Sequence, residues 1–163
     1  MANFLITGGT GFIGRVLVQS LADAGHRATV ITRQPAKHAG RMGDTIQYVG
    51  TFGDIEDSAV FQAVINLGGE GIGDKSWSEK RKQVLLESRI GLTNHLVACL
   101  KRLNTKPEVM ISGSAIGWYG AQDEKPLGED SDCHPEFTHD LCQQWEDAAS
   151  EVKILGIRLC VIR

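Results

Sequence analysis

Three glycines spaced three residues apart, Gly8, Gly11 and Gly14, join an apolar run to an amphipathic segment near the start of the chain. Residues 3–7 predict a buried strand, and apolar residues at helical spacing over 12–24 predict a helix. In such a turn the first glycine permits a tight bend, the second lets backbone approach a pyrophosphate, and the third brings helix close to strand. The helix N-terminus then offers free N–H groups to phosphates. The feature predicts a dinucleotide-binding unit, and a glycine-rich turn without a ligand is the alternative.

The rest of the chain alternates strand and helix patterns. Further strands are predicted at 28–32, at 46–49, within 60–67, at 109–112 and at 157–162. Helical spacing covers 77–102, with Gly91 as a potential interruption, and 139–152, while 34–43 and 121–135 are polar loops. This alternation indicates an α/β fold with a mainly parallel sheet of about six strands. In open sheets of this kind ligands bind beyond the carboxyl ends of the strands.

Composition excludes several classes of protein. The chain has 163 residues and a formal net charge of -3, which does not favour a nucleic-acid surface. No apolar run approaches the roughly 20 residues of a membrane span, and the N-terminus lacks the pattern of a signal peptide. The four cysteines form no CxxC pair, and no His/Cys group has metal-chelating spacing. We therefore expect one cytoplasmic domain over 1–163, with reduced thiols, no metal, and no membrane or nucleic-acid partner.

The end of the second strand bears on the choice of cofactor. An acidic residue at this position binds the ribose 2′-hydroxyl of NAD, whereas a basic residue accommodates the 2′-phosphate of NADP. The sequence has Thr32 and Arg33 there, with Lys37 and His38 nearby and no carboxylate. Because a guanidinium can bind phosphate with two hydrogen bonds, Arg33 favours NADP(H) over NAD(H). The alternative is a solvated surface arginine.

Four motifs together resemble one known family. They are TGGTGFIG at 7–14, NLGGE at 66–70, SR at 88–89 and ISGSAIGWYG at 111–120. The first resembles the extended short-chain dehydrogenase/reductase superfamily. The others resemble its atypical "epimerase family protein" group, which is similar to sugar-nucleotide epimerases. The resemblance covers essentially the whole chain and implies a Rossmann-type, doubly wound fold that holds NADP(H).

Carried over by position, the resemblance places Leu67 and Gly68 along the cofactor and turns Arg89 towards it. A buried helical arginine needs an anionic or carbonyl partner, although a surface salt bridge is the alternative for Arg89. Trp77 matches a tryptophan of the family's Arg-Trp pair, but Ser76 stands in place of the arginine. With the glycine turn and the second strand, the residues expected to bind the cofactor are Gly8, Gly11, Phe12, Ile13, Gly14, Thr32, Arg33, Leu67, Gly68, Glu70 and Arg89.

The superfamily's usual chemistry uses a Ser or Thr, a Tyr that transfers the proton, and a Lys that lowers its pKa. Ser114 matches the serine, with hydrogen bonding to local backbone as its alternative role. Phe137 and Leu141 stand where the Tyr and Lys would be. We therefore take Ser114 and Tyr119 as the catalytic candidates, although Tyr119 could simply pack in its turn. His139 and Glu70 are further acid/base candidates.

The leading functional hypothesis is an NADP(H)-dependent oxidoreductase or epimerase-like enzyme. It would transfer hydride between the nicotinamide and a carbinol or carbonyl carbon of a small or sugar-nucleotide substrate. The alternative is a non-catalytic NADP(H)-binding or redox-sensing regulatory protein. Residues 157–163 resemble the family's sixth strand, so we expect the N-terminal part of a longer protein, with the C-terminal substrate region missing. The oligomeric state stays open, a homodimer included.

Overall fold

Six parallel strands form one sheet in the computed structural model, which describes residues 1–40, 43–124 and 126–163. The strands are β1 (Asn3–Thr7), β2 (Arg27–Ile31), β3 (Ile46–Val49), β4 (Ala63–Asn66), β5 (Val109–Gly113) and β6 (Arg158–Ile162). Their order is β3-β2-β1-β4-β5-β6. The chain therefore reverses its direction across the sheet between β1 and β4, which confirms the predicted doubly wound, Rossmann-type fold.

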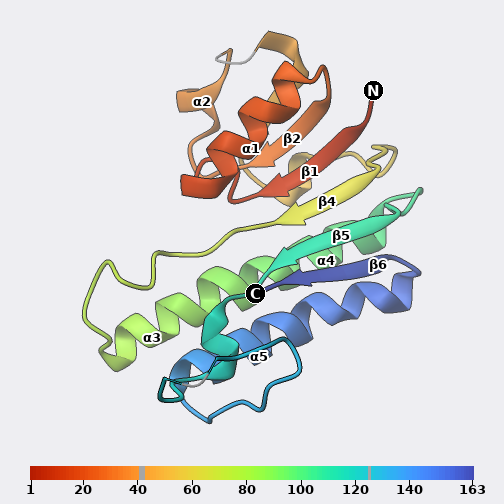
Figure 1. Ribbon diagram of the computed structural model, residues 1–163. Helices are drawn as coiled ribbons and strands as arrows, with labels where there is room; N and C mark the ends of the chain where they lie inside the picture. Colours follow the sequence, from red (N-terminus) through yellow and green to blue (C-terminus); the bar gives the residue numbers. More distant parts are fainter. Residues whose placement is uncertain (41–42, 125) are drawn as a thin grey trace.

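Helices connect the strands on both faces of the sheet (Figure 1). They are α1 (Phe12–Asp23), α2 (Pro35–His38), α3 (Glu79–Leu86), α4 (Leu92–Arg102) and α5 (Phe137–Ser150). Gly25, at φ +73°, follows α1 and takes the left-handed conformation that ends it. The Ser78 hydroxyl caps α3 by accepting a hydrogen bond from the Arg81 N–H at 3.2 Å. No helix of the described residues is long and apolar enough to cross a membrane.

Two segments differ from the sequence prediction. The predicted polar loop at 34–43 contains α2, because Pro35 occupies the first helical position, where its missing N–H costs nothing. Gly91 does not interrupt the long helical stretch. Instead a π-helical turn, Glu87–Gly91, joins α3 to α4, with Gly91 itself in the right-handed helical conformation. A turn of this kind changes the direction of the side chains that follow it, and it recurs at functional sites.

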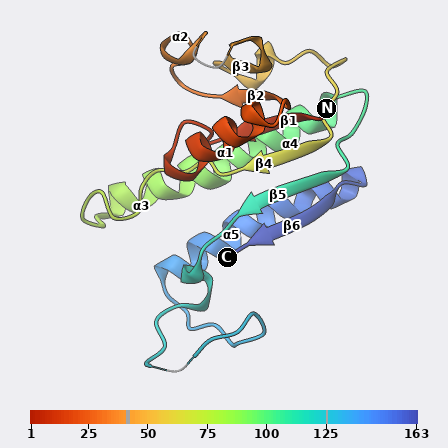
Figure 2. The same ribbon diagram turned by 45° about the horizontal axis from the view of Figure 1, so that its top comes forward.

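The apolar core divides into two layers because successive side chains of a strand face opposite ways. Leu5 of β1 and Val64 of β4 pack with Leu96 and Leu100 of α4 on one face. On the other face Ile6 joins the cluster against α1. Figure 2 shows the sheet with α1 on one side and the α3–α4 and α5 helices on the other. The core therefore covers both faces of the sheet.

Candidate functional site

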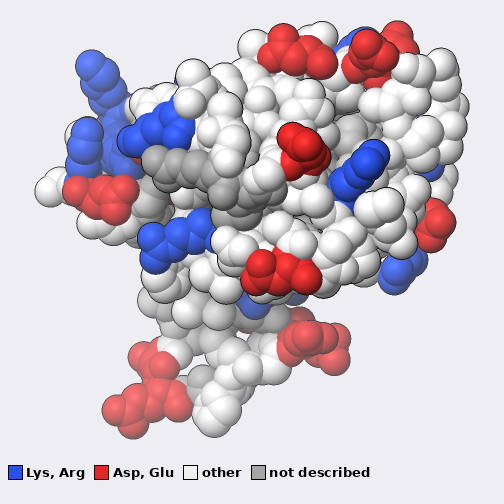
Figure 3. Space-filling model, turned by 90° about the horizontal axis from the view of Figure 1, so that it is seen from above, with Lys and Arg blue, Asp and Glu red and all other residues white. Residues whose placement is uncertain are grey.

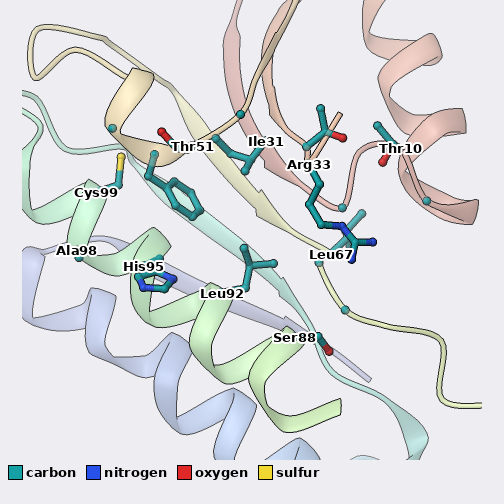
Figure 4. A pocket seen from close by; sticks show the side chains of 18 of the residues that line it. Thr10, Ile31, Arg33, Thr51, Leu67, Ser88, Leu92, His95, Ala98 and Cys99 are labelled. Carbon is teal, nitrogen blue, oxygen red and sulfur yellow. The ribbon is translucent and has the colours of Figure 1, made fainter. Parts of the chain in front are cut away.

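A cleft of about 820 Å³ opens at the carboxyl ends of β1, β2, β3 and β4, at the reversal point of the sheet. Figure 4 shows side chains from these strand ends facing others from the π-helical turn and α4. The residues that line it are Gly8, Thr10, Gly11, Ile31–Arg33, Gly50–Gly53, Leu67–Glu70, Ser88, Leu92, His95, Ala98, Cys99 and Arg102. The cleft lies where ligands of doubly wound folds bind.

The glycine turn brings three backbone segments into close contact. Gly8 has φ +70°, and a Cβ on it would lie 2.5 Å from the carbonyl carbon of Leu67. A Cβ on Gly14 would lie 2.6 Å from the Cα of Gly9 and would also strike the carbonyl oxygen of Gly8. Gly11 is the N-cap of α1, and no side chain of the described residues makes a cap hydrogen bond there, so the first-turn N–H groups are left for a ligand or water. The backbone forms a cradle that fits an anionic pyrophosphate.

The other glycine-turn residues contribute through backbone position. The side chains of Phe12 and Ile13 are exposed, at 82% and 66%, and neither lines the cleft. Their N–H groups belong to the first turn of α1. Any contact of these two residues with a phosphate would therefore be made by main-chain atoms.

Arg33 extends from the end of β2 into the mouth of the cleft (Figure 4). Its side chain is 91% exposed, and its Nη1 lies 3.1 Å from Oε1 of Glu70. Thr32 is fixed because its N–H donates to the carbonyl of Val49 at 3.0 Å. The Arg33 guanidinium therefore lies at the edge of the cleft, where the sequence analysis expects the adenosine ribose of the cofactor. Strand β2 contributes no carboxylate there.

The π-helical turn holds the loop that follows β4. The Ser88 hydroxyl accepts from the Glu70 N–H at 3.1 Å and donates to the Leu85 carbonyl at 3.0 Å. Arg89 Nη2 donates to the Glu70 carbonyl at 3.0 Å, and its guanidinium lies 5.3 Å from the Trp145 ring centre. Burial lowers the pKa of Arg89. Arg89 finds the carbonyl partner that its half-buried position requires, and it supports the cleft without lining it.

A buried polar network lies beneath the reversal point. Thr7 donates to the Asn66 amide oxygen at 2.7 Å, and the Asn66 amide nitrogen donates to Thr93 at 2.9 Å and to Ser112 at 3.1 Å. Thr7 Oγ1 also accepts from the Gly68 N–H at 3.2 Å. These bonds join β1, β4, β5 and α4 and give the buried side chains of the network hydrogen-bond partners. The network fixes Leu67 and Gly68 at the cleft floor.

Ser114 lies after β5 but outside the cleft. Its hydroxyl donates to Oε1 of Glu146 at 2.6 Å, and its N–H donates to the Ile162 carbonyl at 2.7 Å. Glu146 also accepts two hydrogen bonds from Arg163, at 2.9 and 2.8 Å. Burial alone would raise the pKa of Glu146, but the bonds from Arg163 and Ser114 outweigh it and hold that pKa below its usual value. Ser114 thus joins an ion pair between α5 and the end of β6.

Two further acid/base candidates are buried, Tyr119 in the turn after β5 and His139 in the first turn of α5. Tyr119 is 7% exposed, and its hydroxyl donates to the Glu129 carbonyl at 3.3 Å. His139 is equally buried, with Nδ1 2.5 Å from the carbonyl oxygen of Trp118. Neither lines the cleft, whereas Glu70 does. The catalytic assignments of Ser114 and Tyr119 stay predictions.

Several residues lining the cleft escaped the sequence analysis. Thr51 and Phe52 follow the carboxyl end of β3, so the rule for open sheets could have found them. His95 and Cys99 share one face of α4, four residues apart, but nothing in the sequence shows which face meets the cleft. Burial raises the pKa of the Cys99 thiol. Among the described residues, no group of three His, Cys, Asp or Glu side chains could hold a metal ion.

The decisive comparison is with a family model. The model described as the NAD dependent epimerase/dehydratase family matches residues 4–159. The chain belongs to this family. The epimerase family protein YfhF of Bacillus subtilis is 32% identical to this chain in an alignment of 163 positions, which covers 99% of this chain and 54% of that relative. Epimerase family protein SH2119 of Staphylococcus haemolyticus is 34% identical in an alignment of 166 positions, which covers 100% of this chain and 54% of that relative. The chain spans about half the length of these curated epimerase/dehydratase relatives.

One solved structure agrees with this family assignment, and a second has the same fold. Human epimerase family protein SDR39U1, crystallised with NADPH, has a TM-score of 0.78 and 26% identity, covering 99% of this chain and 52% of that one. UDP-glucuronic acid 4-epimerase of Bacillus cereus, in complex with UDP-glucuronic acid and NAD, also scores 0.78, at 19% identity. It covers 99% of this chain and 55% of that one. The second likeness shows the fold alone.

Proposed function

We propose that the cleft binds NADP(H) and that the chain forms the nucleotide-binding part of an NADP(H)-dependent oxidoreductase or epimerase-like enzyme. The observation that most supports this proposal is that one cleft contains both the glycine turn at the N-terminus of α1 and Arg33 beyond β2. The NADPH in human SDR39U1 supports this choice of cofactor. When bound, the nicotinamide would supply the hydride chemistry, and the protein would supply position and electrostatics.

In this proposal each part of the cleft has a separate role. The first-turn N–H groups of α1, with Gly8 and Gly11, bind the pyrophosphate. Arg33 binds the 2′-phosphate, and Leu67 and Gly68 support the cofactor from the end of β4. Ser114 would hydrogen-bond the reacting hydroxyl or carbonyl oxygen of a small or sugar-nucleotide substrate, and Tyr119 is the accompanying candidate for proton transfer. We also propose a cytoplasmic protein that could function as a homodimer.

A second candidate function is a non-catalytic NADP(H)-binding regulatory protein. The packing of Tyr119 and His139 away from the cleft favours it, as do Phe137 and Leu141 in place of a Tyr and a Lys. A panel of carbonyl and carbinol substrates, followed by NADPH absorbance, separates the two functions. The enzyme proposal expects turnover that Ser114→Ala and Tyr119→Phe slow by about a hundredfold. Turnover unaffected by both substitutions would refute the catalytic assignment.

The cofactor proposal is tested by titrating the chain with NADPH and NADH while tryptophan fluorescence is recorded. A charge-assisted hydrogen bond contributes about 1.5–3 kcal/mol, so Arg33→Ala should weaken NADPH binding by about tenfold or more. NADH binding should change by less than about threefold, because NADH carries no 2′-phosphate. The matched control is Arg27→Ala, an exposed arginine at the opposite end of β2. An equal loss for both cofactors would remove the argument for NADP(H).

A further inference from the structure

Glu70 lies between two arginines of opposite exposure. Its Oε1 is 3.1 Å from Nη1 of Arg33, whose side chain is 91% exposed, and its Oε2 is 3.7 Å from Nη1 of Arg81, which is 9% exposed. Arg33 follows β2 and Glu70 follows β4, and β1 lies between these strands in the sheet. The Arg33–Glu70 pair therefore passes over the carboxyl end of β1 and its glycine turn, within the mouth of the cleft.

Arg81 is incompletely paired in this arrangement. Its Nη2 donates to the Gly71 carbonyl at 2.6 Å, but its buried Nε has no hydrogen-bond partner among the residues that the structure describes. The 3.7 Å separation from Glu70 is an ion-pair distance and is too long for a hydrogen bond. A buried guanidinium is costly unless it is paired and hydrogen-bonded. The nearby carboxylate that could complete Arg81 is shared with Arg33.

We propose that the Glu70 carboxylate changes its ion-pair partner when the cofactor binds. It pairs with Arg33 while the cleft holds no phosphate, and it moves to Arg81 once Arg33 binds a phosphate. The inference rests on the proposed NADP(H) binding. A phosphate can replace the carboxylate on Arg33, because both are anions that accept bidentate guanidinium bonds. Glu70 stands between Gly69 and Gly71, and the conformational freedom of glycine lets its backbone adjust. Glu70 keeps a guanidinium partner in both positions.

Two opposite effects on affinity follow from this exchange. Glu70 competes with the 2′-phosphate for Arg33, so its carboxylate opposes NADP(H) binding. Arg81 offers Glu70 a second partner, so its guanidinium favours binding. A carboxylate that served only to build the loop would have the reverse effect, because its removal would loosen the cleft and weaken binding.

The test is a double-mutant cycle on NADPH affinity, measured by tryptophan fluorescence. Exposed ion pairs contribute about 0.2–1 kcal/mol, so Glu70→Gln should tighten NADPH binding by about 1.4- to fivefold. Arg81→Met should weaken it by a similar factor in the wild-type background and have no effect in the Glu70→Gln background. Glu79→Gln, which removes the exposed partner of Lys82 on α3, is the control and should change nothing.

Each outcome decides the proposal. Unchanged or weaker binding by Glu70→Gln would overturn it, even if the wild type binds NADPH and Arg33→Ala weakens that binding as the proposed function requires. Failure of the wild type to bind NADPH would overturn both. Because Arg81→Met removes a buried group, its urea unfolding midpoint is measured alongside, and the isosteric Glu70→Gln variant decides the question if Arg81→Met does not fold.

Discussion

Gly14→Ala tests whether α1 packs backbone-to-backbone against the glycine turn. The added Cβ would lie 2.6 Å from the Cα of Gly9 and 2.9 Å from the carbonyl carbon of Gly8, where real Cβ atoms stay beyond 3.0 Å. Both obstacles are backbone, so α1 has to move. Overpacking costs about 1–3 kcal/mol, and backbone obstacles that cannot rotate away place this site in the upper part of that range, at about 2–3 kcal/mol. Alanine recovers about 1 kcal/mol through its higher helix propensity. We expect a net loss of about 1–2 kcal/mol in the free energy of unfolding.

Gly91→Ala is the matched control, because it adds the same methyl group to another helical glycine. Its Cβ would meet the carboxylate end of Glu87, at 2.5 Å from Cδ, and that flexible side chain can swing away. The gain in helix propensity should then raise stability by about 0.5–1 kcal/mol. For a chain of this size about 1 kcal/mol corresponds to about 2–4 °C in Tm. Gly14→Ala should melt lower than the wild type by about 2–8 °C, and Gly91→Ala should melt higher.

The assay is thermal unfolding followed by circular dichroism, with NADPH affinity measured on each folded variant. Displacing α1 moves its first-turn N–H groups away from the turn, so Gly14→Ala should also bind NADPH more weakly, whereas Gly91→Ala should bind it normally. A Gly14→Ala protein with wild-type Tm and wild-type affinity would refute the reasoning. It would mean that the turn and α1 are farther apart than the structure shows.

Three further predictions concern the buried hydrogen-bond network, the pH dependence of stability and the accessibility of the cysteines. Asn66→Leu should lower the free energy of unfolding in urea by about 2–4 kcal/mol, because it strips hydrogen bonds from buried hydroxyls; an unchanged urea midpoint would contradict this. The pKa of Glu146 is lowered in the folded protein, so its contribution to stability is present above its ordinary pKa of 4.5 and is lost as pH falls through the lower folded value. In Glu146→Gln the urea midpoint should therefore depend less on pH over that acid range. A fall of the midpoint as steep as in the wild type would refute the assignment. Cys133 is exposed and should react with a thiol reagent in the native protein. Cys99 and Cys142 should react only on unfolding, because both are buried and burial raises the pKa of both thiols. Rapid labelling of all three cysteines in the native protein would contradict this prediction.

The strands and the glycine turn could be predicted because their patterns are local. The run at 3–7 and the spacing of Gly8, Gly11 and Gly14 record where backbone turns and where it must approach other backbone. The π-helical turn could not be predicted, because residues 77–102 show only a helical period with one glycine. It arises where Ser88 and Arg89 bond to the loop after β4, which is a tertiary contact.

The candidate site divides in the same way. Arg33 could be placed at the cleft from its position after β2 alone. Ser114 was placed after β5, but its bond to Glu146 depends on how α5 packs across β5 and β6, which no local pattern records. The dual pairing of Glu70 likewise depends on Arg33 and Arg81, residues 37 positions before it and 11 positions after it in the sequence.

Amide chemical-shift mapping with NADPH tests the central claim most directly, because it locates the ligand without requiring a substrate. The account predicts saturable shifts at Gly8 and Gly11, at Arg33 beyond β2 and at Gly68 beyond β4, with smaller changes at Arg33 when NADH is used instead. Shifts confined to another region, such as the hollow between α3 and α5, or no shifts at all, would contradict NADP(H) binding in this cleft.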